Sequence, residues 1–570
     1  MSNLRCVVLG LLLCAAAGGV AAAGQITPGL IGCDTYSVRD YFGSGKMTLE
    51  AFPAFCQENG IQGVCFNDFF FQSWDRPYLE KIKAAVRKHG RVVTGIIRDG
   101  DLAGLDDAAR AKALEECQRK LEAAHFLGAP AMRINVGGTG SEEGDATIGV
   151  QRVIAFFNEL LPLARRLGVK LTIENHGGVS RSADNVLAII KGTDREWVGS
   201  CLDFGNWPDE LRYESCRQLA PYAHMTHAKF RRFNAQGEDP NIDGSRILAM
   251  LQHAGYRGAV SIEFEGEGDQ IVGVQKSRDL IRRYWPAGST GNRWAEIMAG
   301  SPRLERLATG FRFTEGPVWG DGALYFSDVR ANEIRRWSGG RVGTFTTESQ
   351  GANGLAWDGE WLYACRGGAR DVARYRLAGA PVASPLVTEY EGKPLNSPND
   401  LVLGPDGALY FTDPTFGLGD RPQQQPVRGV YRLAGGALTR LVGDREQPNG
   451  VALAPGAFTL YVADSARGQV WAYPLRSSGE VGEGYLFAGL PGNPDGMAVD
   501  TRGNLYVAAG GAIRVLDPAG DRLGVIPIPE EPANCAFGGP DGRTLYVTAR
   551  TSLYAIRLGI PGLRWAAGAR

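Results

Sequence analysis

The chain has 570 residues, of which 44% are hydrophobic and 22% are charged, and its formal net charge is −1 at pH 7. This length exceeds what a single hydrophobic core supports, so we expect more than one domain. The balance of 61 basic against 62 acidic residues argues against a nucleic-acid partner and against attachment to an anionic membrane. Function is therefore expected to lie in discrete sites.

The first residues have the pattern of an export signal. A short start that contains Arg5 precedes the apolar run Cys6–Cys14, and three alanines at 21–23 form a small-residue cleavage motif. The apolar run gives way to alanine and glycine too early for a stable membrane span, so the pattern predicts a signal peptide at 1–23 that is cleaved. We expect an exported protein, periplasmic or extracellular.

From 28 to 286, short β-rich segments alternate with amphipathic helical segments such as LEKIKAAVRKHG and QRVIAFFNELLPLARRLG. Eight strand–helix pairs in about 250 residues predict a (β/α)₈ TIM barrel. The expected strands are Leu30–Tyr36, Gly63–Phe69, Val92–Arg98, Ala131–Val136, Lys170–Asn175, Val198–Phe204, His224–Lys229 and Ala259–Phe264.

Charged residues gather at the ends of the last four predicted strands, in the segments TIENH, CLDFGN, MTHAK and SIEFEG. Because helices cover the outward face of a barrel strand, that face must be apolar and the charged side chains should point inward near the mouth. Carboxylates gathered at the mouth of the barrel would repel one another unless a cation lies between them. Three carboxylates and one imidazole suit Mn²⁺, Mg²⁺, Co²⁺ or Zn²⁺.

These four segments resemble the xylose-isomerase-like superfamily of sugar isomerases and epimerases, over about Gly29 to Trp285. The resemblance implies four metal ligands, two of which also move protons beside a substrate carbonyl or hydroxyl. The implied ligands are Glu174, Asp203, His227 and Glu263, with Glu174 and Glu263 as the catalytic pair. The residues expected to bind substrate oxygens are Arg133, His176 and Lys229.

One position departs from the family pattern. Many epimerases carry His three residues after the strand-six Asp, where this chain has Asn206. An isomerase or epimerase is the first expectation, and a keto-glycoside lyase or a cyclic hydroxy-acid dehydratase is the alternative. Glu265 is the second choice for the ligand role of Glu263. A non-catalytic sugar-binding protein is a further alternative, from a different class.

The polar segment 287–302 contains Gly-Ser-Thr-Gly and predicts a linker. Beyond it, a small apolar strand, an Asp-Gly-type turn and a Leu-Tyr-Val/Phe strand recur six times, at spacings of 38 to 51 residues. Repeats of this length, each with further strand segments, are typical of propeller blades. The sequence therefore predicts an all-β six-bladed β-propeller over 303–560.

Four motifs in this half differ from the plain repeats: TEGPVW, SPND, QPNG and NPDGM. Each places Glu, Asn or Asp beside Gly or Pro just before an expected innermost strand, where propellers bind ligands. Hard oxygen donors from separate blades suit Ca²⁺ or another divalent cation. The alternative is that these are ordinary turns, as expected for Asp321, Asp406, Asp500 and Asp541.

The segments EGPVW, NSPNDLVLGPDGALYFTDPTFG, PNGVAL and PDGMAVD resemble the senescence-marker-protein/gluconolactonase (LRE-like) family, over about Leu304 to Leu558. The resemblance implies that Glu315, Asn449 and Asp495 hold a metal. It also implies that Asn399 binds substrate and that Asp495 activates water against a lactone carbonyl. Other esterase-type hydrolysis is the alternative for this half.

The two halves together predict an exported, bifunctional carbohydrate enzyme. Its expected substrates are a sugar, a keto-sugar or a sugar lactone. Because barrels of this type often pair, a homo-oligomer is a further expectation.

Overall fold

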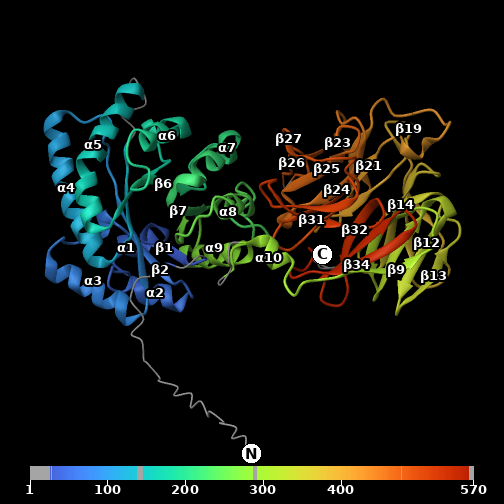
Figure 1. Cartoon of the computed structure of the whole chain (residues 1–570), viewed down its shortest axis with the longest axis horizontal. Coiled ribbons are helices and arrows are strands. Elements are labelled where there is room, and N and C mark those ends of the chain that lie inside the picture. The colour runs from blue at the N-terminus through green and yellow to red at the C-terminus, as the bar shows by residue number, and fades with distance from the viewer. Residues whose placement is uncertain (1–25, 27–28, 138–145, 287–291, 477, 564–570) are drawn as a thin grey trace, which may run out of the picture.

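The computed structural model describes residues 26, 29–137, 146–286, 292–476 and 478–563. The predicted signal peptide and the first part of the predicted linker lie outside these residues. A helix-rich N-terminal half is followed by an all-β C-terminal half (Figure 1). Among the described helices, none is both long and apolar enough to cross a membrane.

The N-terminal half is a closed barrel of eight parallel strands in chain order, which confirms the predicted TIM barrel. Five of the eight strands end one or two residues earlier than predicted. The strands are β1 (Ile31–Asp34), β2 (Gly63–Asn67), β3 (Val92–Arg98), β4 (Ala131–Ile134), β5 (Lys170–Glu174), β6 (Val198–Asp203), β7 (Ala223–Phe230) and β8 (Val260–Phe264).

Helices cover the outside of this barrel, which is why the strands are buried on both faces. In α3 (Arg76–Lys88), Asp75 caps the first turn by accepting from Tyr78 N, and the apolar positions repeat at helical spacing to face the barrel. The other helices are α1 (Arg39–Gly43), α2 (Phe52–Glu58), α4 (Asp107–Leu127), α5 (Ala146–Leu167), α6 (Ala183–Lys191), α7 (Asp209–Leu219), α8 (Gly244–His253) and α9 (Gln270–Tyr284).

The C-terminal half consists of six four-stranded antiparallel sheets, which confirms the predicted six-bladed propeller. Their first strands, β10 (Thr314–Gly320), β14 (Ala352–Trp357), β20 (Leu401–Leu403), β24 (Pro448–Leu453), β28 (Met497–Val499) and β32 (Pro532–Gly538), contact one another in a ring. The strand β9 (Leu304–Thr309) pairs with β34 (Ser552–Arg557) and completes the last blade. The start and the end of the propeller are thereby joined.

The middle and outer strands carry the rest of each blade. The repeated Leu-Tyr pair lies on the second strand, and its six tyrosines are no more than 9% exposed between neighbouring blades. These strands are β11 (Ala323–Asp328), β12 (Glu333–Ser338), β13 (Arg341–Thr346), β15 (Trp361–Arg366), β16 (Asp371–Arg376), β17 (Ser384–Val387), β21 (Leu409–Asp413), β22 (Gly429–Ala434), β23 (Ala437–Val442), β25 (Thr459–Asp464), β26 (Gln469–Pro474), β27 (Tyr485–Gly489), β29 (Leu505–Ala509), β30 (Ala512–Leu516), β31 (Arg522–Pro527) and β33 (Thr544–Ala549), with a small hairpin of β18 (Glu389–Tyr390) and β19 (Lys393–Pro394).

Part of the segment predicted as a linker is the short helix α10 (Arg293–Ile297). Its apolar side chains Trp294 and Ile297 lie three residues apart and pack into the propeller core. The buried Arg293 guanidinium donates to Tyr284 O of the barrel and to Asn504 Oδ1 of the propeller, at 3.3 and 3.0 Å. This helix therefore holds the two halves against each other.

Arg293→Ala should weaken this contact, because Tyr284 O and Asn504 Oδ1 lose a buried charged donor. We expect the free energy of unfolding to fall by about 2 to 4 kcal/mol and the two halves to unfold at more separate temperatures in calorimetry. As a control, Arg376, exposed and paired with Glu360, should tolerate Ala within about 0.5 kcal/mol. An unchanged thermogram for Arg293→Ala would contradict this description of the interface.

Candidate metal centres

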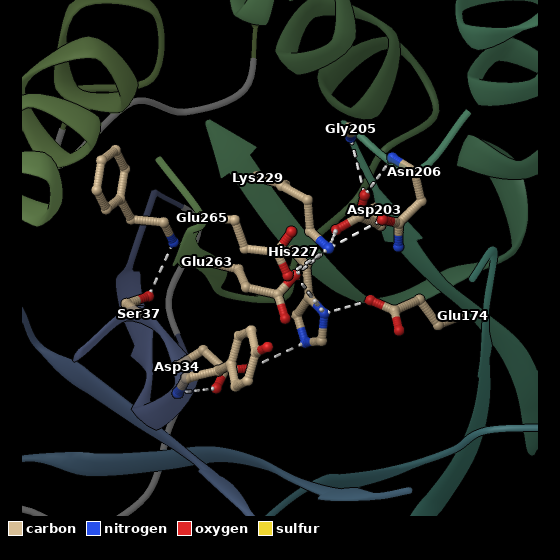
Figure 2. Close-up of polar contacts among 12 residues, drawn as sticks. Asp34, Ser37, Glu174, Asp203, Gly205, Asn206, His227, Lys229, Glu263 and Glu265 are labelled. Atoms are coloured by element: carbon tan, nitrogen blue, oxygen red, sulfur yellow. Dashed lines mark hydrogen bonds and ion pairs between the residues drawn. The ribbon is translucent and has the colours of Figure 1, made fainter. Parts of the chain in front are cut away.

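The four residues predicted to hold a metal in the barrel meet at the ends of β5, β6, β7 and β8 (Figure 2). Glu174, Asp203, His227 and Glu263 each offer one ligand atom, and these atoms all lie within 4.8 Å of one another. All four residues are buried. His227 Nδ1 lies 2.6 Å from Glu174 Oε1 and 3.6 Å from Glu263 Oε2.

Among the described residues, two buried oxygens of this quartet, Asp203 Oδ2 and Glu263 Oε2, have no hydrogen-bond partner. Burial raises the pKa of Asp203, and the charges of Glu263 and Glu174 add to that rise against the opposing effect of Lys229. A divalent cation among three carboxylates and an imidazole would satisfy these atoms together. The residues present therefore fit the predicted metal.

Lys229 lies beside the quartet and is itself buried. Its Nζ is 3.1 Å from Glu263 Oε2, donates to Glu265 Oε1 at 3.0 Å and donates to Asn206 Oδ1 at 2.9 Å. Burial alone would lower the pKa of Lys229, but Asp203 and Glu263 outweigh it and raise the pKa. Glu265 thus pairs with Lys229 and lies outside the quartet, whereas Glu263 belongs to it.

The other two predicted substrate-binding residues are placed differently. Arg133, at the end of β4, donates to both Glu174 Oε2 and Asp99 Oδ1. Burial alone would raise the pKa of Glu174, but Arg133 and then His227 outweigh it and hold the pKa well below its ordinary value. His176 is exposed in the loop beyond β5, where its backbone N donates to Ser180 Oγ at 3.2 Å.

Asp34 is a buried acid at this centre that sequence reasoning missed. It ends β1, and its Oδ2 lies 3.6 Å from His227 Nε2, on the side of the imidazole opposite Glu174. A carboxylate in this place orients a metal-binding imidazole so that the other nitrogen faces the ion. Its one signal in the sequence was its position at a strand end, without a distinctive motif around it.

The propeller centre lies at the inner ring of strands. Glu315 is on β10 and Asn449 on β24, both buried, and the partly buried Asp495 precedes β28. Asn449 Nδ2 donates to Ser465 Oγ at 3.0 Å, while its buried Oδ1 has no hydrogen-bond partner among the described residues. Burial and then the charge of Asp400 raise the pKa of Glu315 to about 8. Oxygen donors that repel one another here fit a hard cation.

The SPND motif contributes Asp400 as well as the predicted Asn399. The Asp400 carboxylate accepts from Val451 N at 3.3 Å and from Asn534 Nδ2 at 3.5 Å, and burial raises its pKa to about 7. Asn399 is held through its backbone, which donates to Thr412 O at 2.9 Å. Neither Asp400 nor Asn534 was predicted. Asp400 lies next to Asn399, which was chosen from the same motif, and Asn534 is not followed by glycine.

Three aspartates at the ends of second strands hold the loops that carry this centre. Each carboxylate accepts from two consecutive backbone N–H groups just before an innermost strand. The bonds run from Arg312 N and Phe313 N to Asp328, from Asn396 N and Ser397 N to Asp413, and from Glu446 N and Gln447 N to Asp464. The Asp of each FSD, FTD or VAD copy is therefore a positioning residue.

Comparison with known proteins assigns both halves. Residues 313–551 match the SMP-30/Gluconolactonase/LRE-like region, and residues 53–284 match the xylose isomerase-like TIM barrel. Over 300 residues the chain is 34% identical to the gluconolactonase of Zymomonas mobilis subsp. mobilis, spanning 46% of this chain and 83% of that protein. The chain belongs to the SMP-30/gluconolactonase/LRE-like family.

Two further proteins are similar to part of this chain. The 6-deoxy-6-sulfogluconolactonase of Pseudomonas putida is 32% identical over 251 residues, which are 41% of this chain and 82% of that protein. A solved gluconolactonase structure from Xanthomonas campestris is 33% identical and covers 47% of this chain and 92% of its own, with a TM-score of 0.44.

The raised pKa of Glu315 predicts a pH dependence of the metal-free protein. A carboxyl whose pKa rises on folding from 4.5 to about 8 stabilises the folded state at low pH, and this contribution is lost as the pH rises through that range. Chelator-treated protein should therefore lose Tm more steeply from about pH 5 to about pH 8 than Glu315→Gln does. Thermal unfolding measures this, and parallel curves for the two proteins would count against the raised pKa.

Proposed function

We propose that the propeller hydrolyses a sugar lactone with Ca²⁺ or another divalent cation held by Glu315, Asn449 and Asp495. This proposal is supported by the position of the three residues at the inner ring of strands in a domain of the gluconolactonase family. Asn449 Nδ2 donates to Ser465 Oγ, which donates to Pro494 O beside Asp495. The relatives named above act by name on gluconolactone and on its 6-deoxy-6-sulfo form, so a sugar lactone is the proposed substrate class.

A cation bound there would polarise the lactone carbonyl. Asp495 would accept the proton of a water that adds to the carbonyl carbon, since burial and the charge of Glu315 raise its pKa. The ring C–O bond then breaks, and the proton passes to the departing ring oxygen to give the open sugar acid. Asn399, next to Asp400 at the same end of β20, would bind a substrate oxygen.

Asp495→Asn tests this role. We expect kcat/KM for glucono-1,5-lactone to fall at least about 100-fold, because the variant loses a proton acceptor and a metal ligand. Chelation should abolish hydrolysis by the native protein, and added Ca²⁺ should restore it. The matched control is Asp541→Asn, in an exposed turn where Asp541 pairs with Arg557. A folded Asp495→Asn protein with the full rate would refute the proposal.

For the barrel, we infer a sugar isomerase or epimerase whose quartet binds Mn²⁺, Mg²⁺, Co²⁺ or Zn²⁺ and polarises a substrate carbonyl. Arg133 and His227 keep the pKa of Glu174 low, so its carboxylate is ionised and available to accept a proton. It would take a proton from the carbon beside the carbonyl, and Glu263 would return one. Lys229 would hold a substrate oxygen, and His176 lies further out at the mouth.

Asn206 favours a second candidate for the barrel. Its Oδ1 accepts from Lys229 at 2.9 Å, so no imidazole occupies this position to assist an epimerisation. Elimination from a keto-glycoside or a cyclic hydroxy acid needs only the base, the acid and the metal. NMR of the products from a panel of keto-sugars and cyclic acids would separate the two reactions.

Glu263→Gln and Glu265→Gln form a matched pair two residues apart on β8 and its loop. We expect Glu263→Gln to lose the barrel metal and Glu265→Gln to retain it, because only Glu263 belongs to the quartet. Elemental analysis after dialysis measures the metal content. Equal metal content in the two variants would contradict the assignment.

We further propose that the protein is exported after cleavage behind Ala23, on the strength of the apolar run and the alanine motif. Mass spectrometry of protein recovered outside the cytoplasm should find a chain that begins at Gly24. A full-length chain retained in the cytoplasm would contradict this. Self-association stays a prediction, which light scattering measures.

A further inference from the structure

The turn between β33 and β34 places Arg550 in a backbone conformation that arginine rarely adopts. Its φ is 43°, in the left-handed region, where a Cβ atom is strained. The corresponding turn of the fifth blade, between β29 and β30, uses Gly510 and Gly511 at positive φ. The sixth blade thus keeps a strained arginine where glycine fits freely. Strain of this kind is a reason to examine what the side chain does.

Within the described part of the chain, the Arg550 side chain lies against an aromatic ring. Its guanidinium carbon lies 5.6 Å from the centre of the Phe313 ring, and that of Arg330, from the first blade, lies 5.2 Å from the same ring. Among the described residues, no carboxylate forms an ion pair with either arginine. By contrast Arg370, also at positive φ, donates to Leu395 O and Pro422 O.

This cationic pair borders the propeller centre. Thr314 N donates to Arg550 O at 2.8 Å, and Thr314 precedes Glu315. Asp328 fixes Phe313 by accepting from its N–H at 2.9 Å. Against the larger effect of burial, the Arg550 charge lowers the pKa of Glu315 and of Asp495. The Arg550 backbone therefore adjoins the strand that carries Glu315, and Arg330 lies against the same Phe313 ring as Arg550.

We propose that Arg330 and Arg550, backed by Phe313, bind an oxyanion on the lactone substrate, at the end remote from the ring ester. This inference rests on the proposed lactonase function. Guanidinium groups recognise carboxylate, sulfonate and phosphate through charged, paired hydrogen bonds, which a neutral hydroxymethyl group does not offer. The preferred substrate class is then an acid-bearing sugar lactone rather than a neutral one.

The test compares kcat/KM of the Ca²⁺-loaded full chain for glucono-1,5-lactone, a glucarolactone and 6-phosphogluconolactone. We expect the native protein to prefer an acid-bearing lactone at least about tenfold, and Arg550→Gln or Arg330→Gln to reduce that ratio about tenfold. The glucarolactone carries a carboxylate and 6-phosphogluconolactone carries a phosphate, so their kcat/KM values show which oxyanion is preferred. The control is Arg376→Gln, at the end of β16 and paired with Glu360, which should keep the ratio.

Arg550→Gly separates a binding role from a structural one. It removes the side chain and relieves the left-handed strain, so Tm should rise while the preference for the acid-bearing lactone is lost. A fall in Tm with an unchanged ratio would show a structural arginine and overturn the proposal. A native ratio near one, or equal losses on both kinds of lactone in Arg550→Gln, would also overturn it.

Failure of the lactonase proposal would be visible separately, as absence of turnover on every lactone. Calorimetry with the open-chain acids then still tests the subsite. The native protein should bind glucarate, with two carboxylates, at least about tenfold more tightly than gluconate, with one, and Arg550→Gln should lose that difference. Equal affinities for the two acids in the native protein would overturn the inference.

Discussion

At two centres the structure buries several carboxylates close to one another, and each site depends on how the charges of these carboxylates are balanced. Like charges in a low-dielectric interior repel and raise one another's pKa values, and ionised groups without partners are costly to bury. In the barrel the conflict involves Asp203, Glu263 and Glu174, and in the propeller it involves Glu315, Asp400 and Asp495. The proposed divalent cations would resolve it at both centres.

The two folds assemble such a centre by different means. In the barrel, parallel strands deliver their last side chains to one mouth, and Arg133 and Lys229 already offset part of the negative charge. In the propeller, each donor comes from a separate blade, so no single strand fixes the geometry. Backbone loops clamped by Asp328 and Asp464 take over that task.

Much of the architecture followed from the sequence, because the alternation of strand and helix and the sixfold Leu-Tyr repeat report burial directly. The charged residues in the motifs at the ends of β5 to β8 were located for the same reason. Isolated residues were not: Asp34, Asp400 and Asn534 act through contacts across strands that no local pattern records. His176 was expected to bind substrate from the end of the fifth strand, whereas β5 ends at Glu174 and His176 lies in the exposed loop.

Anomalous diffraction from crystals soaked in Mn²⁺ tests the central claim most directly. The account predicts two strong peaks per chain, one within ligand distance of Glu174, Asp203, His227 and Glu263, and one within ligand distance of Glu315, Asn449 and Asp495. Peaks confined to exposed surface carboxylates, with both centres empty at saturating Mn²⁺, would contradict it.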